Sequence, residues 1–369
     1  MNNLLNTINE TLLMGPGPSS VSPTVYDSIS KATIGHLDPK FIDIMDAIKG
    51  QLQILMGTKN ELTIPISGTG SAGMETCFVN LIEKGENILI LSNGVFGGRM
   101  IDVCQRLGAN VESINQKWGE AITGDMVSEK IKHKKYDLIA IVHAETSTGV
   151  LNPIEEIAPL INQTNALFIV YAVTSLGGIE IKMDEWGIDA LYSGTQKCLS
   201  CPPGLSPVSF SKRAVDKLIN RKTKVPNWYL DLSMIANYWS GKQRVYHHTA
   251  PINMVYALYQ ALYDIINAKP DNVFQKHENA HQYLCSKLNE LSLELLVKKE
   301  YRLPMLNAIK IPNGIIDIDV RSKLLNDYNI EIGGGLGDLS GKVWRIGLMG
   351  HTANKKNIDR LSKALSEIL

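Results

Sequence analysis

Two features of the chain, a glycine-rich loop and a lysine, have the residue types and positions that chemistry needs. The loop, Gly68-Thr69-Gly70-Ser71-Ala72-Gly73, follows a predicted strand at Leu62–Ser67 and opens a predicted helix over 72–81. Backbone N–H groups at such a helix start bind phosphate, and the helix dipole favours the anion. A dinucleotide site would also need an acidic residue about 20 positions on, at the end of the next strand. That strand ends Leu91-Ser92-Asn93, so the loop predicts a phosphate site without a nucleotide, with a plain tight turn as the alternative.

The lysine is Lys197, which follows an apolar run expected to be a strand over 188–193 and precedes Cys198-Leu-Ser-Cys-Pro-Pro-Gly204. Most lysines are solvated surface residues. A lysine at the end of a buried strand would instead be partly desolvated, which lowers its pKa and favours imine formation. A phosphate loop and an imine-forming lysine are the two contacts that pyridoxal 5′-phosphate (PLP) requires. We therefore expect PLP as the cofactor.

The elements that must position these residues follow from the hydrophobic pattern. Near-continuous apolar runs at 62–67, 87–92, 137–143, 167–171 and 188–193 predict strands that are covered on both faces. Segments with helical spacing lie between them, for example 96–107 and 125–133. This alternation predicts an α/β fold with a mostly parallel central sheet and helices on both faces.

After about Pro251 the pattern changes to a long helical stretch over 252–268 and then to a smaller mixed region, with strand-like runs at 308–311 and 343–348. We expect an N-terminal arm over residues 1–20, a large α/β domain over 21–255 and a small C-terminal α+β domain over 256–369.

Composition excludes several classes of protein. Of the 369 residues, 44% are hydrophobic and 20% are charged, and 37 Lys and Arg balance 37 Asp and Glu. The net charge of zero provides no basic field for nucleic acid and no polybasic membrane anchor. The longest apolar run, 166–173, is far short of a membrane span.

Cysteine usage and the first residues predict a compartment. Five cysteines, an odd number, suggest reduced thiols rather than a disulfide framework. Cys198 and Cys201 form a single C-x-x-C pair, whereas a four-cysteine zinc site would need two. The start of the chain lacks the features of a secretory or transit signal. We expect a cytoplasmic protein with no metal site.

Nine motifs occur along the whole chain: Met14-Gly-Pro-Gly-Pro-Ser19, Ile66-Ser-Gly-Thr-Gly-Ser71, His143-Ala-Glu-Thr-Ser-Thr-Gly149, Ser175-Leu-Gly-Gly178, Tyr192-Ser-Gly-Thr-Gln-Lys197, Pro202-Pro-Gly204, Arg221-Lys-Thr-Lys224, Tyr246-His-His-Thr249 and Lys342-Val-Trp-Arg-Ile-Gly347. Together they resemble the motifs of the class V, fold-type I aminotransferases, in particular the alanine–glyoxylate and serine–pyruvate group. The resemblance implies a PLP-dependent transfer of an amino group from alanine or serine to a 2-oxo acid such as glyoxylate or pyruvate, in a homodimer that shares its active site.

The same resemblance implies a role for each matching residue. Lys197 would bond to the cofactor and move the proton at the substrate α-carbon. Arg345 would bind the substrate carboxylate, because a planar guanidinium matches a carboxylate with two hydrogen bonds. The other residues implied in cofactor binding are Thr69, Gly70, Ser71 and Gln196 at the phosphate, Phe96 stacked on the ring, Thr146 near the phenolic oxygen, Val173 beside the cofactor, and Tyr246 and Thr249 at the phosphate of the partner subunit. His247 and His248 are adjacent, and we interpret them as structural.

Tyr171 departs from the family pattern. The strand before Ser175-Leu-Gly-Gly178 ends, in the family, with an aspartate that pairs with the pyridine nitrogen, and here Tyr171 takes its place. A phenol is neutral at pH 7 and cannot supply that charge. Glu145 and Asp189 are the nearest acids in sequence. Three interpretations follow: a slow aminotransferase, a PLP lyase or desulfurase using Cys285, and a PLP-binding protein with little turnover.

Overall fold

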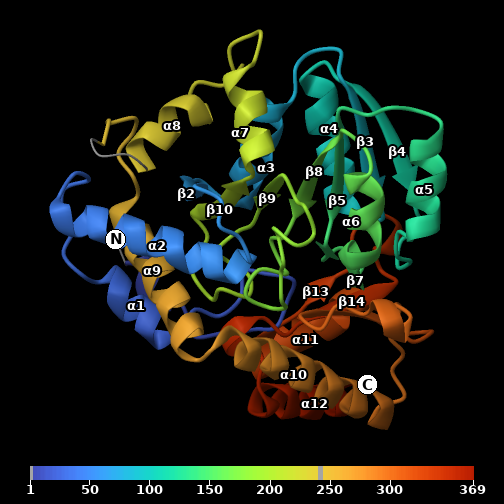
Figure 1. Ribbon diagram of the computed structural model, residues 1–369. Coiled ribbons are helices and arrows are strands. Elements are labelled where there is room, and N and C mark those ends of the chain that lie inside the picture. The colour runs from blue at the N-terminus through green and yellow to red at the C-terminus, as the bar shows by residue number, and fades with distance from the viewer. Residues whose placement is uncertain (1–2, 240–243) are drawn as a thin grey trace.

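The computed structural model describes residues 3–239 and 244–369. Its larger part is built on a seven-stranded sheet (Figure 1). All neighbouring pairs are parallel except those of β10, which runs antiparallel to both β2 and β9. The strand order is β2 (Leu62–Ser67), β10 (Leu205–Phe210), β9 (Ala190–Tyr192), β8 (Leu167–Tyr171), β5 (Leu138–Val142), β3 (Asn87–Ser92) and β4 (Asn110–Asn115).

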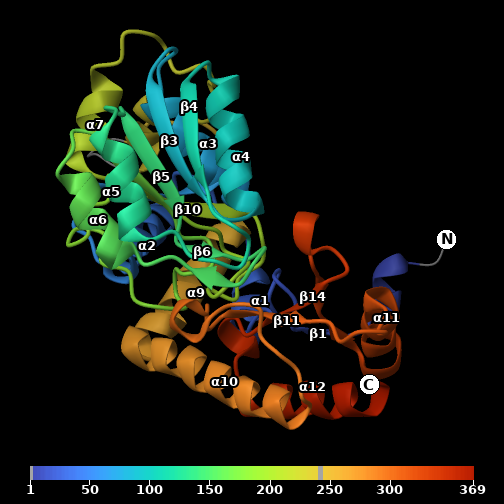
Figure 2. The same ribbon diagram turned by 90° about the vertical axis from the view of Figure 1, so that its right-hand side faces the viewer.

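Helices cover both faces of this sheet. α3 and α4 lie on one face and α5 and α6 on the other, as the side view shows (Figure 2). The strands between them are almost wholly apolar and buried, because neither face meets water. The helices of this part are α1 (Pro23–Ile29), α2 (Pro39–Met56), α3 (Gly70–Leu81), α4 (Val95–Arg106), α5 (Gly124–Lys132), α6 (Ile154–Asn162), α7 (Lys212–Ile219), α8 (Leu232–Trp239) and α9 (Ile252–Asn267).

A smaller part with its own core holds the C-terminal residues. A three-stranded antiparallel sheet places β14 (Val343–Gly347) between β11 (Leu306–Lys310) and β13 (Gly333–Gly334). Three helices pack with it: α10 (Pro270–Glu290), α11 (Asp317–Tyr328) and α12 (Lys355–Ile368). Helix α9, which crosses the predicted boundary at residue 255, contributes its buried face to the core of the larger part.

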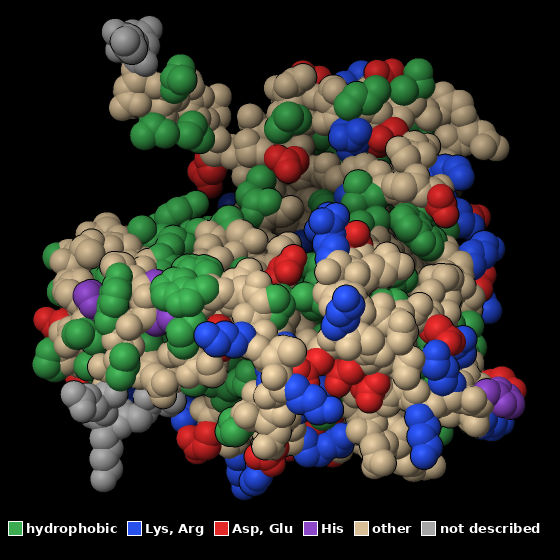
Figure 3. Space-filling view, turned by 90° about the horizontal axis from the view of Figure 1, so that it is seen from above, with side chains coloured by type: hydrophobic (Ala, Val, Ile, Leu, Met, Phe, Trp, Pro, Cys, Tyr) green, Lys and Arg blue, Asp and Glu red, His purple; other side chains and the backbone are tan. Residues whose placement is uncertain are grey.

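The N-terminal segment connects the two parts. β1 (Leu12–Leu13) pairs in parallel with β12 (Ile330–Glu331), and the Gly347 N–H donates to the Met14 carbonyl over 2.7 Å. A few residues on, the Ser19 hydroxyl donates to the Lys197 carbonyl over 2.7 Å. The segment therefore runs from the small sheet to the loop that carries Lys197. Seen from above, the surface is hollowed between the two parts (Figure 3).

Candidate active site

A cavity of about 190 Å³ lies at the carboxyl end of the large sheet. A larger cavity of about 460 Å³, between α1, α2 and α9, contains neither the glycine loop nor Lys197, so size alone does not identify the site. Eight of the predicted site residues line the smaller cavity, although they come from four regions of the chain: Thr69, Gly70, Ser71, Phe96, Tyr171, Val173, Gln196 and Lys197.

The first turn of α3 has the features of a phosphate site. Its N-cap, Thr69, makes no side-chain cap hydrogen bond, so the first N–H groups of the helix remain available to an anion. The side chains of Thr69 and Ser71 are exposed beside them. The Gln196 Oε1 atom is buried without a hydrogen-bond partner among the described residues. These groups fit the phosphate of PLP.

Lys197 faces this turn from the loop that follows β9. Its side chain is buried, and its Nζ atom donates to the Pro16 carbonyl of the N-terminal segment. Burial is the main cause that lowers the pKa of Lys197 from 10.5 to about 8, with the Arg345 charge acting in the same direction and the Glu145 charge against it. At Gly17, a Cβ atom would lie 2.6 Å from Nζ, so a side chain there would collide with the lysine. The amine is therefore fixed in place and partly neutral near pH 8.

The inner wall of the cavity is formed by the side chains of Tyr171, Phe96 and Arg99. Tyr171 ends β8, with its ring 5.3 Å from that of Phe96 and 5.2 Å from that of Tyr192. The guanidinium of Arg99 lies 4.9 Å from the centre of the Phe96 ring. Burial raises the pKa of Tyr171 further above 10, and the charge of Glu145 acts in the same direction. Because the phenol is neutral at physiological pH, the residue at the end of β8 contributes no negative charge to this wall.

Arg345 reaches the site from β14 of the smaller part. Its Nε atom donates to the Gly334 carbonyl over 2.7 Å, and an Nη atom donates to the Thr146 carbonyl over 3.1 Å. Burial lowers its pKa to about 10, so the guanidinium stays charged at pH 7. Within the described residues, no carboxylate oxygen lies within 4 Å of it. Thr146 is buried, and its hydroxyl has no partner among the described residues.

Tyr246 and Thr249 lie outside the cavity of their own chain. Both are exposed, and their hydroxyls are 3.4 Å apart. His248 Nε2 is 2.7 Å from the Ser67 hydroxyl and its Nδ1 is 2.8 Å from Nδ1 of His247, so the pair joins this loop to the end of β2. In the described part of the chain, no cluster of three metal-ligating side chains occurs. The contact of Tyr246 and Thr249 with a partner subunit stays a prediction.

Two residues of the cavity wall, Arg99 and Met74, were absent from the sequence prediction. Arg99 follows Phe96 by three residues on α4, a spacing that places the two side chains on one helix face. That spacing could have identified it. Met74 follows Gly70 by four residues on α3, for the same reason.

The lysine amine and the anion site in one cavity define a class of protein. PLP requires a lysine amine for its aldehyde and an anion site for its phosphate in one cavity, and the mostly parallel sheet places that cavity as in PLP enzymes of fold type I. The chain belongs to the class-V aminotransferase family, whose model matches residues 19–361. It is therefore a PLP-dependent aminotransferase.

Individual relatives agree with this assignment over nearly the whole chain. Alanine–glyoxylate aminotransferase from Rattus norvegicus is 41% identical over 366 residues, which cover 98% of this chain and 88% of the relative. (S)-Ureidoglycine–glyoxylate transaminase from Bacillus subtilis is 35% identical, with 97% and 90% covered. The crystal structure of an alanine–glyoxylate aminotransferase from Nostoc sp. superposes with a TM-score of 0.95 at 44% identity and covers 100% of this chain and 99% of that one.

Cys285, the residue on which the desulfurase interpretation depended, lies elsewhere. It is on α10 of the smaller part, 3.6 Å from a ring nitrogen of His281, and does not line the cavity. A cysteine desulfurase from Thermococcus onnurineus, at 14% identity and a TM-score of 0.75, shares the fold alone. None of the helices that the structure describes is long and apolar enough to cross a membrane.

Proposed function

We propose that the chain transfers the amino group of a small amino acid, alanine or serine, to a small 2-oxo acid, glyoxylate or pyruvate. Relatives support this choice: the rat and Nostoc proteins are named for alanine and glyoxylate, and the Bacillus protein also takes glyoxylate by name. The free cysteines, four of them buried, suit a reducing compartment such as the cytoplasm.

The observation that carries the proposal is the state of Arg345. Among the described residues, this buried guanidinium donates only to two backbone carbonyls and has no ion-pair partner, and burying a charge without one is costly. A carboxylate from an amino acid or 2-oxo acid would provide that partner with charge-assisted hydrogen bonds.

The residues divide the work as follows. PLP, when bound, supplies an aldehyde that bonds to amino groups and a ring that takes up electron density. The α3 N-terminus, with Thr69 and Ser71, would hold the phosphate, and Phe96 would pack on the ring. Lys197, with its pKa lowered to about 8, can both accept and return a proton at the substrate α-carbon near neutral pH. Arg345 would fix the substrate by its carboxylate.

Tyr171 is the reason to expect slow turnover. Its hydroxyl can donate one hydrogen bond to a ring nitrogen, but a neutral phenol does not favour protonation of that nitrogen as a carboxylate would. We propose that the enzyme binds PLP and transaminates with a low kcat. A PLP-binding protein with little turnover is the second candidate, and Tyr171 is the observation that favours it.

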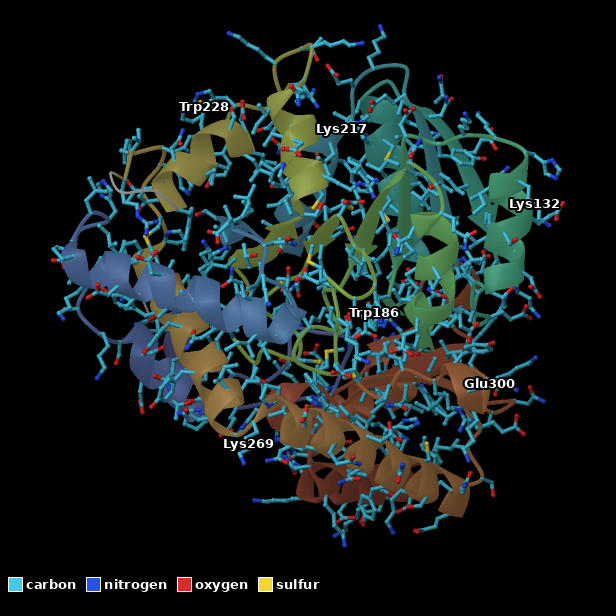
Figure 4. All side chains as sticks on the ribbon, viewed as in Figure 1. Lys132, Trp186, Lys217, Trp228, Lys269 and Glu300 are labelled. Atoms are coloured by element: carbon cyan, nitrogen blue, oxygen red, sulfur yellow. The ribbon has the colours of Figure 1, made fainter. Side chains whose placement is uncertain are left out.

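A homodimer is part of the proposal. Trp228, 63% exposed, stacks on His247 and stands at the outer edge of the molecule (Figure 4), and Tyr246 is 55% exposed. Exposed aromatic side chains of this size are typical of subunit interfaces. We propose that this loop contacts a second copy and extends Tyr246 and Thr249 toward its phosphate site.

A panel of amino donors and 2-oxo acceptors, run with the PLP-loaded protein, tests the function. We expect alanine or serine with glyoxylate or pyruvate to give the highest kcat/KM, and the mass by light scattering to be that of a dimer. Arg345→Lys should raise KM for each substrate that works. Turnover of none of these pairs by a protein that binds PLP would favour the binding-protein candidate and overturn the proposal.

A further inference from the structure

Glu145 is a fully buried acid beside the site. In each hydrogen bond described below, its carboxyl oxygens are the acceptors. It ends β6 (Ala144–Glu145), which pairs with β7 (Val150–Leu151) in a short hairpin. Its Oε1 atom accepts from the Ser147 N–H over 3.1 Å and from the Ser147 hydroxyl over 2.6 Å. Its Oε2 atom accepts from the Phe96 N–H over 3.2 Å. Burial raises the pKa of Glu145, and the hydrogen bonds from Ser147 and Phe96 act in the opposite direction. Each of these contacts is donated to the carboxyl oxygens, so the geometry of the contacts fits the ionised form.

The hairpin also caps the helix that carries Phe96. Helix α4 has Gly94 at its N-cap and therefore no side-chain cap of its own. Glu145 takes the Phe96 N–H, and the Ser147 hydroxyl accepts from the Val95 N–H over 3.0 Å. A Cβ atom on Gly94 would lie 2.4 Å from both the Glu145 carboxyl carbon and the Ser147 hydroxyl. Close contact of hairpin and helix therefore requires glycine there, and it fixes the backbone of Phe96.

The residue between these two connects the hairpin to the substrate side of the cavity. The Thr146 carbonyl accepts the hydrogen bond from Arg345. Three consecutive residues, 145 to 147, thus contact the aromatic that faces Tyr171 on one side and the arginine from the smaller part on the other.

The charge of Glu145 acts on both cations of the site. It raises the pKa of Lys197 and the pKa of Arg345, against the lowering effect of burial on each. The thiol of Cys198, whose pKa burial raises to about 12, carries no charge near pH 8. The charged or titratable groups around Lys197 are Cys198 on its own loop, Glu145 on β6, Arg345 on β14, and Tyr171 and Arg99 around the cavity.

We propose that Glu145 is a positioning residue, which fixes Phe96 against the cofactor ring and supplies the buried negative charge that balances Lys197 and Arg345. This inference rests on the proposed function for what the site binds. If it is correct, the β6–β7 hairpin couples the side of the cavity that holds the cofactor ring to the side that holds the substrate carboxylate.

The test compares four variants by two readouts that need no turnover. The readouts are the dissociation constant of PLP, from fluorescence quenching, and the pH midpoint at which apoenzyme combines with PLP, from visible absorbance. Glu145→Gln should bind PLP at least ~10-fold more weakly and lower the midpoint by about one pH unit, because loss of the negative charge favours the neutral amine. Ser147→Ala, which retains the charge, should weaken PLP binding but leave the midpoint unchanged.

Asp189→Asn is the matched control. Asp189 is another buried acid, directly before β9, where it accepts from the Phe168 N–H over 3.0 Å and from the Ser211 hydroxyl over 2.7 Å, and it does not line the cavity. This variant should lower the melting temperature without changing either readout. If Glu145→Gln leaves both readouts unchanged, or if Asp189→Asn shifts them equally, the proposal is wrong.

A conservative variant keeps the test informative if the Glu145→Gln protein fails to fold. Glu145→Asp keeps the charge on a shorter side chain, so it should retain the pH midpoint and still weaken PLP binding. A midpoint that falls as far in Glu145→Asp as in Glu145→Gln would overturn the electrostatic role. Because both readouts concern PLP alone, a negative result in the substrate panel would leave this outcome unaffected.

Discussion

Replacing Tyr171 by aspartate tests the most unusual residue of the site. The change removes a phenol at the end of β8 and places a carboxylate on the wall of the cavity. If the enzyme transaminates slowly because that wall lacks a negative charge, Tyr171→Asp should raise kcat. Tyr171→Asn is the matched control, since asparagine opens the same space and carries no charge.

The substitution has two energetic effects of opposite sign: a loss of packing in the apoenzyme and a stronger hydrogen bond to bound PLP. The Tyr171 ring packs between Phe96 and Tyr192, at 5.3 and 5.2 Å, and loss of a buried aromatic costs about 3–5 kcal/mol. Both variants should therefore lower the free energy of unfolding of the apoenzyme by about 3 kcal/mol or more. With PLP bound, a charge-assisted hydrogen bond of about 1.5–3 kcal/mol would replace a neutral one of about 0.5–1.5 kcal/mol. The difference, roughly 1.4 kcal/mol, corresponds to about tenfold.

The assay measures kcat, KM and the PLP dissociation constant for the wild type and both variants at saturating PLP. Tyr171→Asp should bind PLP about tenfold more tightly than Tyr171→Asn, and its kcat should exceed that of the wild type by about tenfold with a smaller change in KM. A PLP-saturated Tyr171→Asp whose kcat is equal to or below that of Tyr171→Asn would refute the reasoning. Tyr171 would then be a residue adapted to another reaction.

Three further predictions concern the groups that face the cofactor and substrate. Lys197→Ala should abolish turnover and the borohydride-reducible PLP adduct, as shown by mass spectrometry of the reduced protein; an adduct retained at this site would exclude Lys197 from the role. In the wild type, the rate at which apoenzyme combines with PLP should rise with pH around a midpoint near 8 and then level off, because the neutral amine reacts; a midpoint near 10.5 would show that burial does not lower this pKa. Arg345→Lys should raise KM for amino and oxo acids about 10- to 100-fold while PLP content stays constant, since lysine cannot bind a carboxylate with a planar pair of hydrogen bonds; unchanged KM values would remove its carboxylate-binding role.

The sequence predicts the apolar strands well and β10 not at all. β2, β3 and β8 have the predicted bounds, because each is a continuous apolar run between polar residues. β10 reads Leu-Ser-Pro-Val-Ser-Phe, and proline is rare in a strand with neighbours on both sides. Its serines pair across the sheet, Ser206 with the Ser193 carbonyl and Ser209 with the Thr63 hydroxyl. Partners so far away in sequence cannot be seen in a local pattern.

The candidate site could likewise be predicted from the sequence only in part. Residues within motifs, such as Lys197 and Gly70, were predicted because each motif places its chemistry at one end of one element. The position of Glu145 was not predicted, since its role depends on a helix start about fifty residues earlier, at Phe96. The acceptor for Lys197, the Pro16 carbonyl, comes from a segment that no spacing rule connects with the lysine.

The N-terminal segment has a consequence for the order in which the site is made. β1 holds its place by pairing with β12, and Met14 accepts from Gly347, so residues 12–14 stay unpaired until residues 330–347 have been synthesised. The strands of the large sheet are complete by residue 210 and can assemble while translation continues. During that interval Lys197 lies on the loop after β9 without the Pro16 carbonyl in position. A nascent chain can therefore build the scaffold early, but it acquires a finished site only after residues 330–347 have been made.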